Sequence, residues 1–101
     1  MNILLTSAGR RTYLVEYFKK ALGGQGKVYA SNSIDTYTLH QADGYVITPT
    51  IYDKEYINFL ISYCEKNRIS AIISLFDIDL PVLAKHKDDF EKEGIKVVVS
   101  D

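Results

Sequence analysis

Short apolar runs alternate with amphipathic stretches along the whole chain, and this alternation constrains the fold more than any other feature. A run such as residues 3–6 has the length of a buried strand, whereas the stretches between runs repeat their apolar residues at helical spacing. No hairpin signal joins two strand-like runs, so the sequence predicts an α/β fold with a parallel sheet covered on both faces. We expect strands at residues 3–6, 27–30, 45–47, 71–73 and 95–99.

The first strand is apolar on both faces and begins the chain, which predicts that it lies at the centre of the sheet. We expect a three-layer α/β/α domain with strand order 3-2-1-4-5 and right-handed crossovers. One helix, over residues 53–67, is apolar on more than one stripe, so another element or an interface should cover it. The other helical segments are expected over residues 13–22, in a short turn over 36–41, and from Asp79 or Leu80 to Gly94.

Composition is that of a single small domain. The chain has 101 residues, of which 47% are apolar and 25% charged. Twelve Lys and Arg against thirteen Asp and Glu give a net charge of −1, which argues against nucleic acid or a membrane surface as a partner. The first strand leaves no room for a signal peptide, and Cys64 is the only cysteine, so we expect a cytoplasmic protein without an internal disulfide.

Three polar clusters follow predicted strands: residues 7–11, residues 31–35, and Asp77 with Asp79. The carboxyl ends of parallel strands lie at one edge of a sheet, and open α/β sheets bind ligands there. We therefore expect Arg10 and the Gly9 backbone to share this edge with Asn32 and Asp77.

Gly9, Arg10 and Arg11 stand at the turn from the first strand into the first helix. Glycine permits a sharp turn, and the free N–H groups at a helix start favour an anion. Arginine can bind a carboxylate or a phosphate through two hydrogen bonds, so this segment predicts an anion site. The alternative is a pair of solvated arginines that the helix start merely tolerates.

The acidic pair admits two interpretations. Asp77 and Asp79 could bind Mg²⁺ or a substrate amine, or they could cap the helix that follows. Neither His40 nor His86 has partners at metal-ligand spacing, so no metal site is expected in this chain.

Three other nucleotide or phosphate patterns are missing from this sequence. A dinucleotide site needs G-x-G-x-x-G after the first strand and an acid after the second, whereas here there is one glycine and Ser31-Asn32. No Gly-Lys-Ser/Thr follows the first strand, which excludes a P-loop, and the acids of a phospho-acceptor receiver domain are also missing.

Ordered motifs give the chain a family resemblance. They are ILLTSAGRRTYLVEYFK at residues 3–19, QADGYVITP at 41–49, and the stretch from YDKEYINFL to EGIKVVVSD at 52–101. With these motifs the chain resembles the N-terminal domain that precedes the nucleotide-binding domain in ATP-grasp enzymes, with the nearest likeness to carbamoyl-phosphate-synthase large-subunit-like proteins.

The resemblance implies a Rossmann-like domain on the substrate side of a ligase. Such enzymes use ATP to convert a carboxylate into an acyl phosphate, which an amine or similar nucleophile then attacks. It also implies that Gly9, Arg10, Arg11, Asn32 and Asp77 face the cleft, with Asp79 helping or capping its helix. ATP and Mg²⁺ would belong to the ATP-grasp domains of a longer parent, so we expect the chain to be an inactive fragment by itself.

Two other functions stay open at this point. One is a stand-alone sensor that binds a small molecule or a nucleotide, and the other is a non-catalytic interaction module. A homodimer is a further expectation, because the apolar helix over residues 53–67 could lie at an interface.

Overall fold

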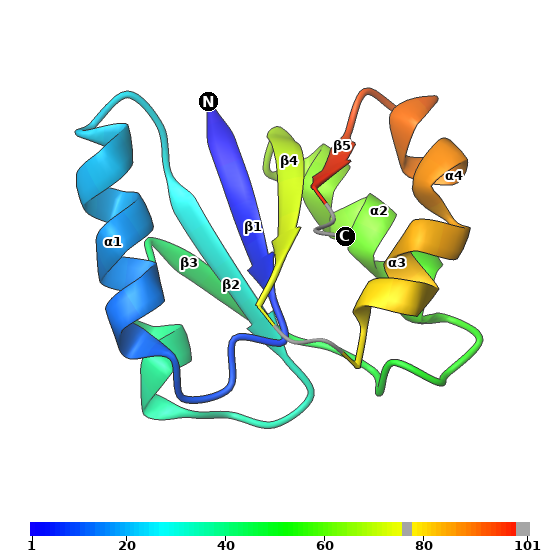
Figure 1. Cartoon of the computed structure of the whole chain (residues 1–101), viewed down its shortest axis with the longest axis horizontal. Coiled ribbons are helices and arrows are strands. Elements are labelled where there is room, and N and C mark those ends of the chain that lie inside the picture. The colour runs from blue at the N-terminus through cyan, green and yellow to red at the C-terminus, as the bar shows by residue number, and fades with distance from the viewer. Residues whose placement is uncertain (76–77, 99–101) are drawn as a thin grey trace.

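The computed structural model describes residues 1–75 and 78–98 of the chain. Its sheet has five strands, all parallel, in the order β3-β2-β1-β4-β5 (Figure 1). This confirms the predicted fold class and strand order. The strands are β1 (Asn2–Thr6), β2 (Val28–Asn32), β3 (Gly44–Ile47), β4 (Ile69–Ser74) and β5 (Lys96–Val98).

Helices cover both faces of the sheet, which gives the predicted three layers (Figure 1). Helix α1 (Thr12–Leu22) and the 3₁₀ helix η1 (Tyr37–Gln41) lie over one face. Helices α2 (Tyr56–Lys66), α3 (Leu80–Lys85) and α4 (Lys87–Glu91) lie over the other. Right-handed crossovers require this division, because the chain moves outward on one side of β1 and then outward on the other side.

The alternation of side chains along β1 builds a core on each face. Ile3 and Leu5 pack with Val15 of α1, whereas Leu4 packs on the opposite face with Leu60 of α2 and Phe90 of α4. Both Leu4 and Leu5 are fully buried, which explains why an apolar run without alternation marks the central strand.

Helix α2 starts later than the sequence suggests. We expected Asp53 as its N-cap, but the helix begins at Tyr56, and Asp53 accepts a hydrogen bond from the Glu55 amide at 2.8 Å. Asp53 therefore closes a turn that precedes the helix. The expectation that another element covers this helix is confirmed for one side, because Tyr56, Leu60 and Cys64 are buried against the sheet.

The helix expected between Asp79 and Gly94 is two short helices. The break lies at His86, whose backbone leaves the helical region (φ −106°, ψ 16°) between α3 and α4. Leu83 of α3 and Phe90 of α4 are both buried in the same core cluster. Strand β2 also differs from expectation, since it includes Ser31 and Asn32, which we assigned to a loop.

No helix within the described parts of the chain is long and apolar enough to span a membrane.

Candidate functional site

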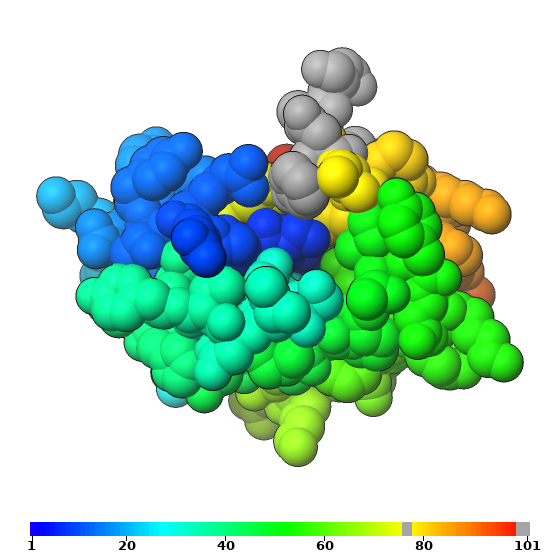
Figure 2. All heavy atoms as spheres, turned by 90° about the horizontal axis from the view of Figure 1, so that it is seen from below, coloured from blue at the N-terminus to red at the C-terminus, as the bar shows by residue number. Residues whose placement is uncertain are grey.

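The carboxyl ends of the central strands meet at the lower edge of the molecule in Figure 1. Figure 2 looks onto this edge, where the segments after β1 (blue), β2 (cyan-green) and β3 (green) form one continuous face. Parallel topology brings these segments together although they are far apart in sequence.

The loop of residues 7–11 is held tightly against the segment that follows β2. The Ala8 amide donates to the Ser31 carbonyl at 3.0 Å, and the Thr36 hydroxyl donates to the Gly9 carbonyl at 2.7 Å. The Gly9 amide points at the Asn32 side-chain oxygen, at 3.4 Å. Gly9 and Asn32 therefore lie side by side, as predicted, and the left-handed φ of +54° at Gly9 explains why glycine stands there.

The same loop leads into α1 and leaves donors free at the helix start. Arg11 is the N-cap residue but makes no side-chain cap bond, and its carbonyl accepts from the Leu14 and Val15 amides. Within the described part of the chain, the amides of Thr12 and Tyr13 donate to no backbone acceptor. These amides lie at the positive end of the helix dipole, which is an arrangement that binds anions.

A hollow of about 520 Å³ opens beside this helix start. The exposed Arg10 lines it, together with Ile34 and Tyr37. These two apolar side chains are 67% and 71% exposed, so they are free to contact a ligand. The remaining lining residues are Thr12, Asp35, Thr36 and Thr38.

Comparison with known families shows which family the chain belongs to. The family model described as PylC-like, N-terminal domain, matches residues 3–98. The chain belongs to the PylC-like N-terminal domain family. This is the domain that precedes the nucleotide-binding domain in ATP-grasp proteins, so the resemblance drawn from the motifs is confirmed. A search of the curated proteins finds no match to the chain.

Sequence reasoning missed Ile34, Tyr37 and Thr38 as lining residues of this PylC-like domain. Ile34 gave a usable signal, because it is the one large apolar residue in an otherwise polar segment after β2. An apolar residue in such a segment is either buried or available to a ligand, and the structure shows the second case for Ile34.

Of the two aspartates predicted to belong to the site, the structure describes only Asp79. Asp77 lies outside the described residues. Asp79 is fully buried, so its carboxylate does not line the hollow beside Arg10, and it makes no side-chain cap bond to α3. Instead the hydroxyls of Ser7 and Ser74 donate to it.

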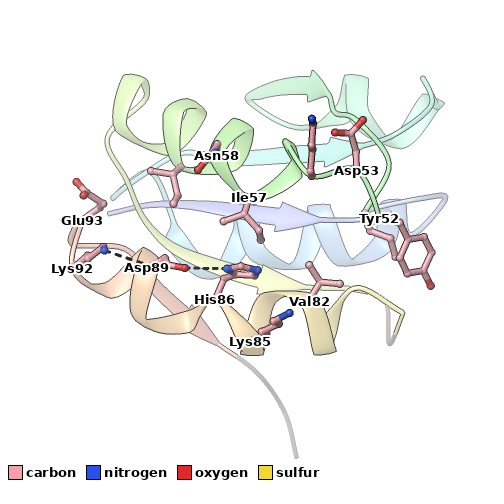
Figure 3. Close-up of a pocket in the computed structure, with 13 residues that line it drawn as sticks. Tyr52, Asp53, Ile57, Asn58, Val82, Lys85, His86, Asp89, Lys92 and Glu93 are labelled. Atoms are coloured by element: carbon pink, nitrogen blue, oxygen red, sulfur yellow. Dashed lines mark hydrogen bonds and ion pairs between the residues drawn. The ribbon is translucent and has the colours of Figure 1, made fainter.

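A second hollow, of about 650 Å³, lies between α2 and the α3–α4 pair (Figure 3). Ile57 and Val82 form part of its floor, and His86 hydrogen-bonds to Asp89 at 2.9 Å. That hydrogen bond, with a smaller effect of Lys92, lowers the pKa of Asp89. The groove is thus lined by apolar residues and by charged ones, of which His86 and Lys92 pair with Asp89.

No group of three metal-ligating side chains occurs within residues 1–75 and 78–98.

Proposed function

We propose that this PylC-like domain is the substrate-side domain of an ATP-grasp ligase. In such an enzyme ATP phosphorylates a carboxylate, and an amine or similar nucleophile displaces the phosphate from the acyl phosphate. The domain would bind and orient the carboxylate substrate and would not catalyse the reaction alone. ATP and Mg²⁺ would be held by ATP-grasp domains of a parent protein, and a closer relation to carbamoyl-phosphate-synthase large subunits stays a hypothesis.

The observation that carries this proposal is the anion-binding arrangement after β1. Free amides of Thr12 and Tyr13, the dipole of α1 and the exposed Arg10 all favour negative charge at the same place. A carboxylate, or the phosphate that replaces it, has the charge and the acceptor oxygens to use these donors.

The neighbouring side chains indicate what kind of chemical group is attached to this carboxylate. Ile34 and Tyr37 offer apolar and aromatic surface in the same hollow as Arg10. We infer that the substrate joins its carboxylate to an apolar or aromatic group, because burial of such a group against these side chains adds binding free energy.

Anion binding can be tested on the chain itself with inorganic phosphate and acetate as probes. We expect both anions to shift the backbone NMR signals of Gly9, Arg10, Thr12 and Tyr13. In Arg10→Gln the dissociation constants should rise about 3- to 10-fold, because an exposed charge-assisted hydrogen bond is lost. Arg68→Gln is the matched control, since Arg68 is exposed and precedes β4 at the opposite edge of the sheet. Equal effects of the two substitutions would contradict a site at Arg10.

The alternative function is a sensor that binds a small molecule without turning it over. An assay on the intact protein separates the two proposals. A ligase releases phosphate from ATP only when both the carboxylate and the nucleophile are present, whereas a sensor binds its ligand and releases no phosphate.

A further inference from the structure

Asp79 lies at the centre of a buried group of hydroxyls that joins four elements. Its side chain is 0% exposed. The Ser7 hydroxyl, just after β1, donates to Oδ2 at 2.7 Å, and the Ser74 hydroxyl at the end of β4 donates to Oδ1. The Tyr56 phenol, at the start of α2, lies close enough to Asp79 for the charge of this carboxylate to raise the pKa of the phenol.

A buried carboxylate needs partners, because removing it from water costs free energy. All the hydrogen-bond partners of Asp79 found in the described residues are hydroxyls, and none is a cation. Burial, followed by the charge of Asp79, raises the pKa of Tyr56, so this phenol keeps its proton and adds no second negative charge beside Asp79. Helix capping does not explain the carboxylate, since it makes no cap bond.

Ser7 connects this buried group to the predicted anion site. Its φ of +51° is in the left-handed region, which is unfavourable for a residue with a Cβ atom. Such a conformation persists only where surrounding contacts hold it, and the hydrogen bond to Asp79 is one such contact. Ser7 is also the first residue of the loop that carries Gly9, Arg10 and Arg11.

We propose that Asp79 is a positioning residue that acts through Ser7. It holds Ser7 in the left-handed conformation and so fixes the backbone of residues 7–11. The loop then presents Arg10 and the free amides of α1 in one arrangement before any ligand arrives. What the loop binds rests on the proposed function, but the positioning itself does not depend on it.

Backbone hydrogen exchange of the loop tests this role. The Ala8 and Arg11 amides report on the loop, because Ala8 donates to Ser31 and Arg11 donates to Ala8. In Asp79→Asn and in Ser7→Ala, we expect these two amides to exchange at least about 10-fold faster, after correction for any change in global stability. A hydrogen bond to a charged group has about that strength. Asp79→Asn weakens the contact that Ser7→Ala removes, so the double variant should exchange no faster than Ser7→Ala alone.

Ser74→Ala is the matched control, since it removes another hydroxyl from the same carboxylate at a residue of β4, outside residues 7–11. It should lower global stability and leave the corrected exchange of Ala8 and Arg11 unchanged. If Ser74→Ala loosens the loop as much as Asp79→Asn does, or if the effects of Asp79→Asn and Ser7→Ala add, Asp79 has only a structural role in the core.

Two further measurements keep the test decisive. If Asp79→Asn does not fold, Ser7→Ala alone decides, and unchanged exchange in that variant overturns the proposal. Phosphate titration gives a separate readout: weaker binding in Asp79→Asn with normal binding in Ser74→Ala supports the role of Asp79. If the unmodified chain binds no phosphate, the proposed anion site fails, while hydrogen exchange still decides whether Asp79 positions the loop.

Discussion

Burial changes the chemistry of Cys64, the only cysteine of the chain. The thiol is fully buried in the core under α2, and burial, with a smaller effect of Glu65, raises its pKa to about 12. Because the thiolate is the reactive form, the folded protein should react slowly with thiol reagents at pH 8. We expect a disulfide reagent to modify Cys64 only as fast as the protein unfolds, and immediately in denaturant. Rapid modification under native conditions would contradict the burial.

The same pKa shift predicts how stability depends on alkaline pH. An unfolded thiol ionises at about pH 8.5, below its folded pKa, so the unfolded state loses its proton first. Stability from this group is therefore complete below about pH 8.5 and decreases as the pH rises towards 12. Urea unfolding between pH 8 and 10 should show a smaller decrease in Cys64→Ala than in the unmodified chain.

Gly44 is needed because of a neighbour rather than because of its backbone angle. A Cβ atom at this position would lie 2.6 Å from the ring of Tyr29 on the adjacent strand. That ring also packs edge-on against Tyr63, so it cannot move without disturbing α2. Gly44→Ala should therefore destabilise the protein by about 1–3 kcal/mol, measured by urea unfolding. In a Tyr29→Ala background, Gly44→Ala should lower the free energy of unfolding much less. An equal decrease in that background would rule out the clash with the Tyr29 ring.

At the scale of elements, the chemistry of helix ends limited what the sequence could predict. Gly23 ends α1 in the left-handed conformation, as its residue type indicates. The N-cap predicted at Asp53 was wrong, and the single helix predicted from Asp79 or Leu80 to Gly94 is two helices that meet at His86. Topology placed Gly9 beside Asn32 correctly, since parallel strands end together. The contact of Ser7 with Asp79 joins residues 72 positions apart, and local pattern carries no information about such pairs.

His86 and Asp89 form an ion pair at the start of α4, and this pair stabilises the fold when Asp89 is ionised. The hydrogen bond from His86, and then the charge of Lys92, lowers the pKa of Asp89 from its ordinary value of 3.8. A lowered pKa adds stability above the unfolded value, and this stability is lost as the pH falls through the folded value. We expect Asp89→Asn to be slightly less stable than the unmodified chain at pH 7 and to lose less stability between about pH 5 and pH 3, measured by urea unfolding curves across this range, with a small difference because the carboxylate is exposed. Asp88→Asn, one residue away, is the control, and identical curves for both variants would contradict the pairing.

At the scale of the whole molecule, exposed apolar side chains gather at the carboxyl edge of the sheet rather than on α2. The exposed side chains of this kind in the loops and helix starts of that edge include Tyr13, Ile34, Tyr37, Tyr52 and Ile78. Helix α2 buries one side in the core, and its remaining apolar residues are half-buried. If the domain associates with partner domains or with a second copy, this edge offers the better surface.

The last prediction concerns ATP. The described edge offers an arginine, a helix start and a few hydroxyls to a triphosphate, and no cluster of acids for Mg²⁺ within residues 1–75 and 78–98. Association costs about 4–15 kcal/mol in lost translational and rotational freedom, and a few exposed contacts do not offset that cost to give tight binding. Calorimetric titration of the chain with Mg·ATP should therefore show no micromolar binding, and the chain should not hydrolyse ATP.

Inorganic phosphate, titrated under the same conditions, is the control for simple anion binding at Arg10. A dissociation constant of about 1 μM for Mg·ATP, equivalent to about −8 kcal/mol, would mean that the domain holds a complete nucleotide site. The substrate-side role would then be wrong, and the sensor would become the better proposal.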